Sequence, residues 1–250
     1  MRRKTIILTA ATLIALAFLL LVPAAGVPIL AYHMVNDLDE TYSISPSEFE
    51  EQMAYLAQQG YTSITLAQLL DGMEGKTSLP PKPIVITFDD GYADNAEIAL
   101  PIMARYGMNA TIFIIAGHAG EPPYMSWEEI KAIQRTGTEI GSHTYSHEAL
   151  SEINPTDQLQ EVFESKKTLE AELQQPVGFL AYPYGKFSPA VVAALKQAGY
   201  RGACSGKAGL NKQGVDPYIL KRVNVPQPKF GLWEFRLRLW RAEIYSKLNL

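Results

Sequence analysis

Apolar and polar positions follow two different periods along the chain, and this pattern predicts alternating strands and helices. Short runs of consecutive apolar residues, such as 84–88 (IVITF), are typical of strands that are buried on both faces of a parallel sheet. Elsewhere apolar residues recur every three or four positions, as Phe49, Met53 and Leu56 do, which is typical of amphipathic helices. The strand candidates cover 27–31, 61–64, 84–88, 110–115, 139–142, 177–182, 201–205 and 219–225.

Capping residues mark where the helices begin and end. Ser45 and Pro46 match an N-cap followed by a proline in the first helical position, and Glu48 completes the sequence signature of a capping box. Ser126 begins another capped helix, and Gly60 stands where a glycine commonly ends one. The helix candidates cover 46–59, 66–73, 95–106, 127–136, 156–174 and 188–197.

About seven strands that alternate with helices predict an α/β fold with a parallel sheet. The sheet can close into a barrel or stay open and doubly wound, and in both cases functional groups lie at the carboxyl ends of the strands. The chain contains no glycine-rich phosphate or dinucleotide fingerprint, so we predict the barrel. A length of 250 residues is consistent with one domain, which we place at 27–228.

The first 26 residues predict export. Arg2, Arg3 and Lys4 precede an apolar run over 6–22, and small residues follow it. This run is near the lower limit of length for spanning a bilayer, so 1–26 is either a secretory signal peptide or a retained membrane anchor. In both cases we expect the body of the protein at the extracellular face of the membrane, or secreted and associated with the cell wall.

The last 22 residues, 229–250, interleave aromatic and basic side chains and predict an amphipathic helix. Such a helix can lie in the interface of the bacterial membrane surface. Alternatively, it can pack across the bottom of the barrel with its arginines directed outward.

Charge and cysteine content exclude several classes of protein. The net charge is −4, and residues 28–228 hold 14 basic against 24 acidic residues, so we expect no binding to nucleic acid. The single cysteine, Cys204, rules out an internal disulfide framework and any cysteine-rich zinc site. We expect a monomer.

Three groups of polar residues directly follow strand candidates. TFDDG at 87–91 brings Asp89 and Asp90 to one strand end, where two carboxylates are costly unless a cation or a reaction uses them. SHTYSH at 142–147 places His143 and His147 four residues apart, and they can share a helix face or converge from a loop. Two imidazoles and a carboxylate form an open three-ligand site of the kind found around catalytic zinc.

The third group is YPYG at 182–185. In this order and separation the three motifs resemble those of the metal-dependent polysaccharide deacetylase family, the carbohydrate esterases of the nodulation-type deacetylase domain. LAYH at 30–33 and FLAYPYG at 179–185 are similar to the exported, intercellular-adhesion-type deacetylases of biofilm poly-β-1,6-N-acetylglucosamine. The resemblance implies a distorted (β/α) barrel, in agreement with the strand count.

The resemblance also implies a role for each motif residue. Asp90, His143 and His147 match the metal ligands, and Asp89 matches the general base that takes a proton from water. The backbone N–H of Tyr184 is expected to stabilise the oxyanion, and acetate is released from an extracellular N-acetylglucosamine polymer. Zinc is the first choice of metal, and the same donors also accept nickel, cobalt or iron.

The chain departs from the family pattern at two positions. An arginine before Pro-Tyr is missing, and no histidine follows His147 to protonate the leaving amine. The adhesion-type resemblance implies a circular shift, in which His33 at the end of the first strand acts as the general acid. By the same logic Arg222, on the last strand candidate, replaces the missing arginine and orients Asp89.

Several aromatic residues are candidates for lining a sugar cleft, although core packing is an alternative for each of them. They are Tyr32, Trp127, Tyr145, Tyr182 and Tyr184. His118 lies in a Gly-Ala loop, and we expect it to be a bystander rather than a ligand. Peptidoglycan, chitin oligomers or an O-acetylated glycan are alternative substrates. A catalytically inactive carbohydrate-binding module is disfavoured because a lectin needs no water-activating metal site.

Overall fold

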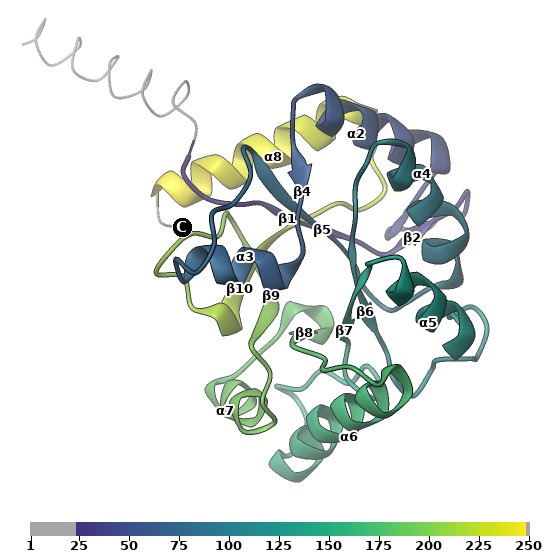
Figure 1. Ribbon diagram of the computed structural model, residues 1–250, viewed down its shortest axis with the longest axis vertical. Coiled ribbons are helices and arrows are strands. Elements are labelled where there is room, and N and C mark those ends of the chain that lie inside the picture. Colours follow the sequence, from purple (N-terminus) through teal and green to yellow (C-terminus); the bar gives the residue numbers. More distant parts are fainter. Residues whose placement is uncertain (1–23, 249–250) are drawn as a thin grey trace, which may run out of the picture.

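The computed structural model describes residues 24–248 and folds them around a closed barrel of seven parallel strands (Figure 1). The barrel closes because β1 pairs with both β10 and β5, so that Leu30 lies opposite Val223 on one side and Ile86 on the other. The predicted single-domain α/β barrel is therefore confirmed. Its strands are β1 (Ile29–Tyr32), β5 (Pro83–Phe88), β6 (Thr111–Ile114), β7 (Glu139–Ser142), β8 (Phe179–Ala181), β9 (Gly202–Ala208) and β10 (Leu220–Asn224).

One strand candidate lies outside this ring. Residues 61–64 form the short strand β4 (Thr62–Ser63), which pairs with β5 beyond the closed barrel. Its two polar side chains have no apolar face to insert into the core, so the strand remains an appendage. A separate two-stranded parallel sheet, β2 (Met34–Val35) with β3 (Ser43–Ile44), follows β1.

The helices cover the outside of the barrel (Figure 1). Ser126 and Glu129 form a complete capping box. The predicted box at Ser45 is only half formed, because the Glu48 side chain accepts a hydrogen bond from the Ser45 hydroxyl instead of the backbone N–H. The α-helices are α2 (Pro46–Gln58), α3 (Leu66–Met73), α4 (Leu100–Arg105), α5 (Trp127–Arg135), α6 (Pro155–Leu173), α7 (Pro189–Gln197) and α8 (Gly231–Leu248).

The predicted helix 95–106 begins as a π-helical turn, η1 (Asn95–Ala99), and only then becomes α4. Pro101 has no N–H to donate, and the N–H of Leu100 reaches five residues back to the carbonyl of Asn95. Turns of this kind occur frequently at functional sites, and Asn95 does contact a candidate catalytic residue.

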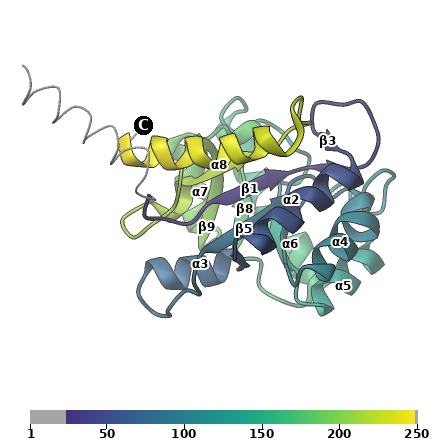
Figure 2. The same ribbon diagram turned by 90° about the horizontal axis from the view of Figure 1, so that it is seen from above.

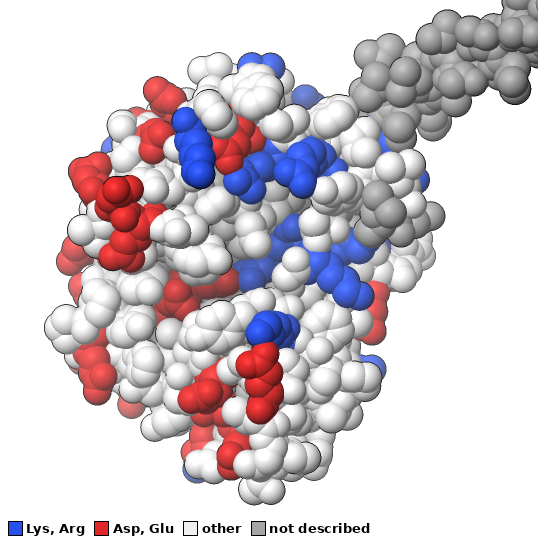
Figure 3. All heavy atoms as spheres, turned by 180° about the vertical axis from the view of Figure 1, so that it is seen from behind, with Lys and Arg blue, Asp and Glu red and all other residues white. Residues whose placement is uncertain are grey.

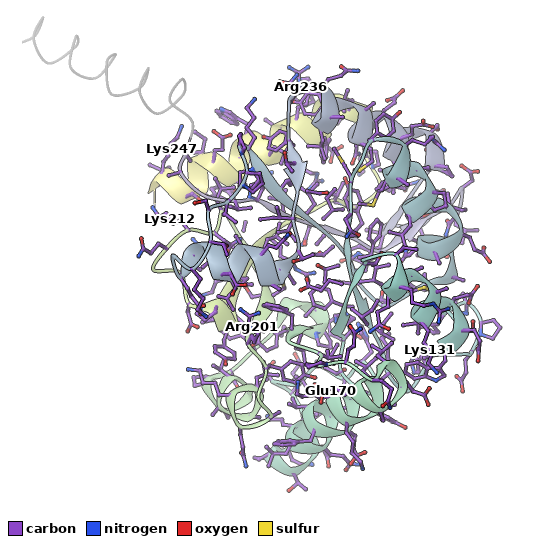
Figure 4. The ribbon with its side chains drawn as sticks, in the orientation of Figure 1. Lys131, Glu170, Arg201, Lys212, Arg236 and Lys247 are labelled. Atoms are coloured by element: carbon purple, nitrogen blue, oxygen red, sulfur yellow. The ribbon has the colours of Figure 1, made fainter. Side chains whose placement is uncertain are left out.

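Alternate strand residues belong to two different apolar clusters. Ile29 and Val85 belong to a cluster that fills the barrel, whereas Leu30 and Ile86 pack outward under the helices. The inner cluster continues into α3, which closes the end of the barrel at the amino ends of the strands. Arg201, which Figure 4 labels, forms an ion pair of 2.6 Å with Asp71 of α3 and ties this helix to the barrel.

The C-terminal helix α8 lies along the outer wall of the barrel. It packs against α2 and β10 through Phe235, Leu239 and Ala242 (Figures 1 and 2). The alternative that it crosses the bottom of the barrel is wrong, because α3 already occupies that position.

Among residues 24–248, no helix combines the length and the apolar composition that crossing a bilayer requires. The predicted signal peptide or anchor, 1–26, lies almost entirely outside the described residues, so its status stays a prediction.

Candidate active site

A cavity of about 310 Å³ opens at the carboxyl ends of the barrel strands, where active sites of such barrels lie. It brings together all the residues predicted as metal ligands, general base and general acid, together with Arg222 and Tyr184, whereas Tyr182 and the other aromatic candidates for a sugar cleft, Tyr32, Trp127 and Tyr145, do not line it. The residues that line it are His33, Tyr42, Asp89, Asp90, His143, His147, Tyr184, Gly185, Gly206, Arg222 and Asn224.

Asp89 and Asp90 reach the same cavity because the chain turns sharply between them. The N–H of Asp89 donates to the carbonyl of Tyr32 (2.9 Å) and continues the pairing of β5 with β1. Asp90 then adopts a left-handed backbone conformation with φ of +73°. Gly91 follows at φ +81°, and a Cβ at this position would lie 2.7 Å from Cδ1 of Ile114. The turn therefore cancels the strand alternation that would separate the two carboxylates.

His143 directly follows β7 and is held in a single tautomer. Its Nδ1 lies 2.8 Å from the carbonyl oxygen of Ala181, which can only accept a hydrogen bond. The proton therefore sits on Nδ1, and the lone pair of Nε2 is directed elsewhere. Burial lowers the pKa of His143 to about 3, so the ring is neutral, as a metal ligand must be.

His147 reaches the cavity from a loop and not from a helix. Thr144 and His147 both have positive φ values, of +67° and +65°, and the His147 N–H donates to Thr144 Oγ1 (3.1 Å). The Glu161 carboxylate accepts the backbone N–H groups of Tyr145 and Ser146, both at 2.9 Å. The two histidines therefore converge through a loop turn, one of the two arrangements that their spacing allows.

Asp90, His143 and His147 form a cluster that fits a divalent cation. Nε2 of His143 and Nε2 of His147 lie 3.4 and 3.3 Å from Asp90 Oδ1, and the three ligand atoms lie within 4.8 Å of one another. Asp90 Oδ1 is buried without a hydrogen-bond partner, and burial together with the neighbouring Asp89 charge raises the pKa of Asp90 to about 7. A cation would offset this cost, and two imidazoles with one carboxylate are suitable donors for it.

Asp89 is paired with Arg222. Nη1 of Arg222 donates to Asp89 Oδ1 (2.7 Å), and its Nε donates to the carbonyl of Ser205 (3.4 Å). Burial alone would raise the pKa of Asp89, but the nearby charges, led by Arg222, outweigh it and hold that pKa well below its usual range. Asp89 is therefore ionised at neutral pH and able to accept a proton.

His33 stands on the other side of Asp89. Its Nε2 lies 3.8 Å from Asp89 Oδ2, and its carbonyl accepts a hydrogen bond from Nδ2 of Asn95 (2.7 Å). The His33 ring packs against Tyr42, with ring centroids 4.5 Å apart. Burial lowers the pKa of His33, and the Asp89 charge opposes that shift. Sequence reasoning missed Tyr42 and Asn95, and no local pattern marks either of them.

Tyr184 lies at the rim of the cavity. Its side chain is 68% exposed, its ring centroid lies 5.0 Å from that of His147, and its backbone is left-handed at φ +57°. Its backbone N–H has no acceptor within residues 24–248. The next residue must be glycine, because a Cβ on Gly185 would lie 2.4 Å from Cα of Gly206.

Tyr182 does not line the cavity, so its expected contact with substrate is wrong. The side chain is buried, its hydroxyl donates to the carbonyl of Tyr218 (3.0 Å), and its ring stacks on Phe187. Tyr32 is also buried, with its hydroxyl bonded to Gln52. Trp127 packs against the apolar core.

A neighbouring cavity of about 260 Å³ shares Asp90, His147 and Tyr184 with the active-site cavity. His118 lines this second space, and its ring lies against that of Tyr124. It does not belong to the cluster of possible metal ligands.

Known proteins resemble this chain in sequence and in fold. A family model described as polysaccharide deacetylase matches residues 76–203. A Bacillus subtilis (strain 168) protein, YxkH, named as a candidate polysaccharide deacetylase, is 33% identical over 203 residues, which cover 80% of this chain and 72% of that protein.

A poly-β-1,6-N-acetyl-D-glucosamine N-deacetylase of Staphylococcus aureus (strain MRSA252) is 28% identical over 219 residues, covering 80% of this chain and 73% of the relative. The solved structure of IcaB from Ammonifex degensii superposes with a TM-score of 0.77 at 28% identity, over 88% of this chain and 98% of that one. The chain therefore belongs to the polysaccharide deacetylase family and is a deacetylase enzyme.

Proposed function

We propose that this protein is a metal-dependent N-deacetylase that removes acetyl groups from an extracellular poly-N-acetylglucosamine and releases acetate. The observation that carries the proposal is the cluster of Asp90, His143 and His147, which shares one cavity with the ionised Asp89 and with His33. The name of the Staphylococcus aureus relative supports a poly-β-1,6-N-acetylglucosamine substrate.

The carboxylate of Asp90 and the Nε2 atoms of His143 and His147 would hold the metal ion. Zinc is the first choice, and nickel, cobalt and ferrous iron suit the same donors. When bound, the ion polarises the acetamide carbonyl and lowers the pKa of a water molecule. The hydrogen bond from His143 Nδ1 to Ala181 keeps the Nε2 lone pair available for this role.

Asp89 accepts the proton of the attacking water. Arg222 occupies Asp89 Oδ1, which leaves Oδ2 as the accepting atom on the side of His33. The backbone N–H of Tyr184 donates a hydrogen bond to the oxygen that becomes negative as water adds to the carbonyl. The ion pair with Arg222 keeps Asp89 ionised between turnovers.

Protonated His33 donates its Nε2 proton to the amide nitrogen as the C–N bond breaks. The electron pair of that bond stays on nitrogen, so the products are a free amine on the sugar and acetic acid, whose proton passes to the amine to leave acetate and an ammonium group. Asp89 then carries one proton more and His33 one fewer. A separation of 3.8 Å between Asp89 Oδ2 and His33 Nε2 allows the proton to return after a small rotation of either side chain.

Acetate release from poly-β-1,6-N-acetylglucosamine tests the proposal. We expect release by the wild-type protein, loss of release after chelation, and recovery when zinc is added back. Asp89→Asn is the matched control, because it keeps the shape of the side chain but cannot take up a proton at neutral pH. Release that persists unchanged in excess chelator contradicts the metal dependence, and release only from an O-acetylated glycan contradicts the substrate.

We also propose that the enzyme acts outside the cell, because segment 1–26 has the composition of an export signal. Fractionation of cells that produce the full chain tests this location. Recovery of the protein in the cytoplasm would contradict it.

A further inference from the structure

A second cavity adjoins the active-site cavity on the side of α8. It has a volume of about 190 Å³ and shares Gly206, Arg222 and Asn224 with the active-site cavity. We call it the arginine cavity, after Arg222, Arg238 and Arg241, which all line it. Its remaining wall residues are Ala208, Val223, Ala242 and Tyr245.

The lining of the arginine cavity is positive. It holds three guanidinium groups and no carboxylate. Arg222 is engaged with Asp89, and Arg238 is engaged with Glu234 (2.5 Å). Arg241 has no carboxylate partner within residues 24–248; its Nη2 donates to the hydroxyl of Tyr245 (2.7 Å).

This positive lining contrasts with the rest of the protein. Residues 28–228 carry an excess of acidic groups, and Asp89 and Asp90 line the adjoining active-site cavity. Figure 3 shows Lys and Arg side chains gathered mainly on one side of the central hollow of this face, with Asp and Glu in the hollow, below it and along the opposite edge. Basic groups are thus concentrated beside the active site on a protein that is otherwise acidic.

We propose that the arginine cavity binds an anionic group, a phosphate or a carboxylate, that the glycan carries next to the sugar undergoing deacetylation. Guanidinium groups match the geometry of both anions and bind them through paired hydrogen bonds. Because the two cavities share Gly206, Arg222 and Asn224 as lining residues, they lie close enough for a glycan held in the active site to place a neighbouring substituent in the arginine cavity. This inference rests on the proposed function and extends its substrate class to N-acetylglucosamine polymers that also bear anionic substituents.

The inference also predicts a direction for the polymer. A sugar that has lost its acetyl group carries a positive amine, which the arginine cavity repels. The deacetylated part of the chain therefore leaves on the other side of the active site.

Two N-acetylglucosamine oligomers of equal length test the proposal, one neutral and one bearing a phosphate or carboxylate substituent. The measured quantity is the ratio of their kcat/KM values, charged over neutral. We expect Arg241→Gln to lower this ratio about tenfold, the effect of losing one charged hydrogen-bonding partner. Arg236→Gln is the matched control, because Arg236 also lies on α8 but packs over the Tyr55 ring, outside the arginine cavity (Figure 4). It should leave the ratio unchanged.

A ratio that is the same in wild type and Arg241→Gln overturns the proposal. Binding of the charged oligomer to the metal-free protein is measured separately by calorimetry. This measurement does not require deacetylation, so it distinguishes failure of the anion-binding proposal from failure of the proposed function. If the charged oligomer binds in a manner that depends on Arg241 but no acetate is released, the result supports anion binding in the arginine cavity. The same result contradicts the proposal that the enzyme deacetylates this glycan.

Two competitors distinguish the possible sources of the anion. Inorganic phosphate and vesicles that contain an anionic phospholipid are each added to the calorimetric experiment. If Arg241→Gln weakens binding of the vesicles but not of the charged oligomer, the arginine cavity binds a lipid headgroup, and the proposal that it binds an anionic group of the glycan is wrong. If Arg241 governs binding of free phosphate alone, the assignment fails as well.

Discussion

Arg222 donates a hydrogen bond of 2.7 Å from Nη1 to Oδ1 of Asp89, and both side chains are buried. The two residues come from β10 and from the end of β5, the strands that flank β1 in the closed barrel. This pairing supports the prediction that Arg222, on the last barrel strand, replaces the arginine that the sequence lacks before Pro183. Closure of the barrel brings together charges that are 133 positions apart in the sequence.

We expect Arg222→Gln to lower the free energy of unfolding by about 3–5 kcal/mol, because it leaves Asp89 as an unpaired buried charge. The double variant Asp89→Asn with Arg222→Gln should be more stable than Arg222→Gln alone, since neither member of the pair is then charged. Urea unfolding of the single and double variants measures the difference. A double variant as unstable as the sum of the two single variants would show that the pair contributes no coupling.

Metal binding should be visible in stability as well as in activity. Zinc at about 100 times its Kd stabilises a folded protein by about 2.7 kcal/mol, so the Tm of the wild type should rise. Asp90→Asn and His147→Ala should lose this rise, together with zinc content measured by mass spectrometry. His118→Ala should keep both, because His118 lies nearby but outside the cluster. Full zinc binding by His147→Ala would refute the ligand set.

His33→Ala should lower kcat by about 10²–10⁴-fold, the range expected when a general acid is removed. The metal content should stay at the wild-type level, because His33 contacts Asp89 and is not among the possible ligands. Acetate release and metal analysis on the same preparation check both statements. Near-normal turnover would assign His33 a structural role only.

The barrel was predictable because its strands carry a local signature. The prediction of 139–142 coincides with β7, and 84–88 differs from β5 by a single residue. The ligand candidates follow these strands directly, so that the fold alone brings them to one end of the barrel. Closure of the barrel, in contrast, depends on contacts between residues that are far apart in the sequence. Residues 61–64 lie outside the ring because β1 pairs directly with β5, and no short segment of the sequence includes both of these strands.

Tyr182 was misplaced although a local rule would have placed it correctly. Side chains alternate along β8, so that Phe179 and Ala181 belong to the inner cluster, whereas Leu180 and Tyr182 belong to the outer one. Asn95 was missed for the opposite reason. Its side chain contacts the carbonyl of His33, which lies 62 positions earlier in the sequence. Asn95 is also the first residue of the π-helical turn that precedes Pro101, and no local pattern predicts this turn.

Glu139 should make stability depend on pH. Its carboxylate accepts the N–H groups of Leu66 (2.8 Å) and Ala67 (3.1 Å) at the start of α3, and burial raises its pKa in spite of these bonds. The folded state therefore binds this proton more tightly than the unfolded chain, and stability declines as pH rises from about 4.5 through the folded pKa.

Glu139→Gln lacks this titration. The free energy of unfolding of the wild type, measured relative to Glu139→Gln in urea, should therefore become less favourable as pH increases. A relative stability that grows with pH would contradict the raised pKa.

The outer face of α8 leaves large aromatic side chains in water. Phe230, which directly precedes α8, is 71% exposed and Trp233 is 61% exposed. Trp240 also lies on the exposed side, whereas Phe235 and Leu239 anchor the helix to the barrel. Removing the whole helix would uncover the core, so point substitutions are the better test of the predicted contact with the membrane surface.

In a chain that begins at Ala24, the double variant Trp233→Ser with Trp240→Ser should change the free energy of unfolding by about 0.5 kcal/mol or less. Its affinity for vesicles with anionic phospholipid should fall about tenfold or more, because each indole that enters the interface buries a large apolar surface. Phe163→Ser, at an exposed aromatic position on α6, is the matched control and should bind vesicles as the wild type does. Equal binding by the double variant and the wild type would leave α8 as a packing element of the barrel wall and nothing more.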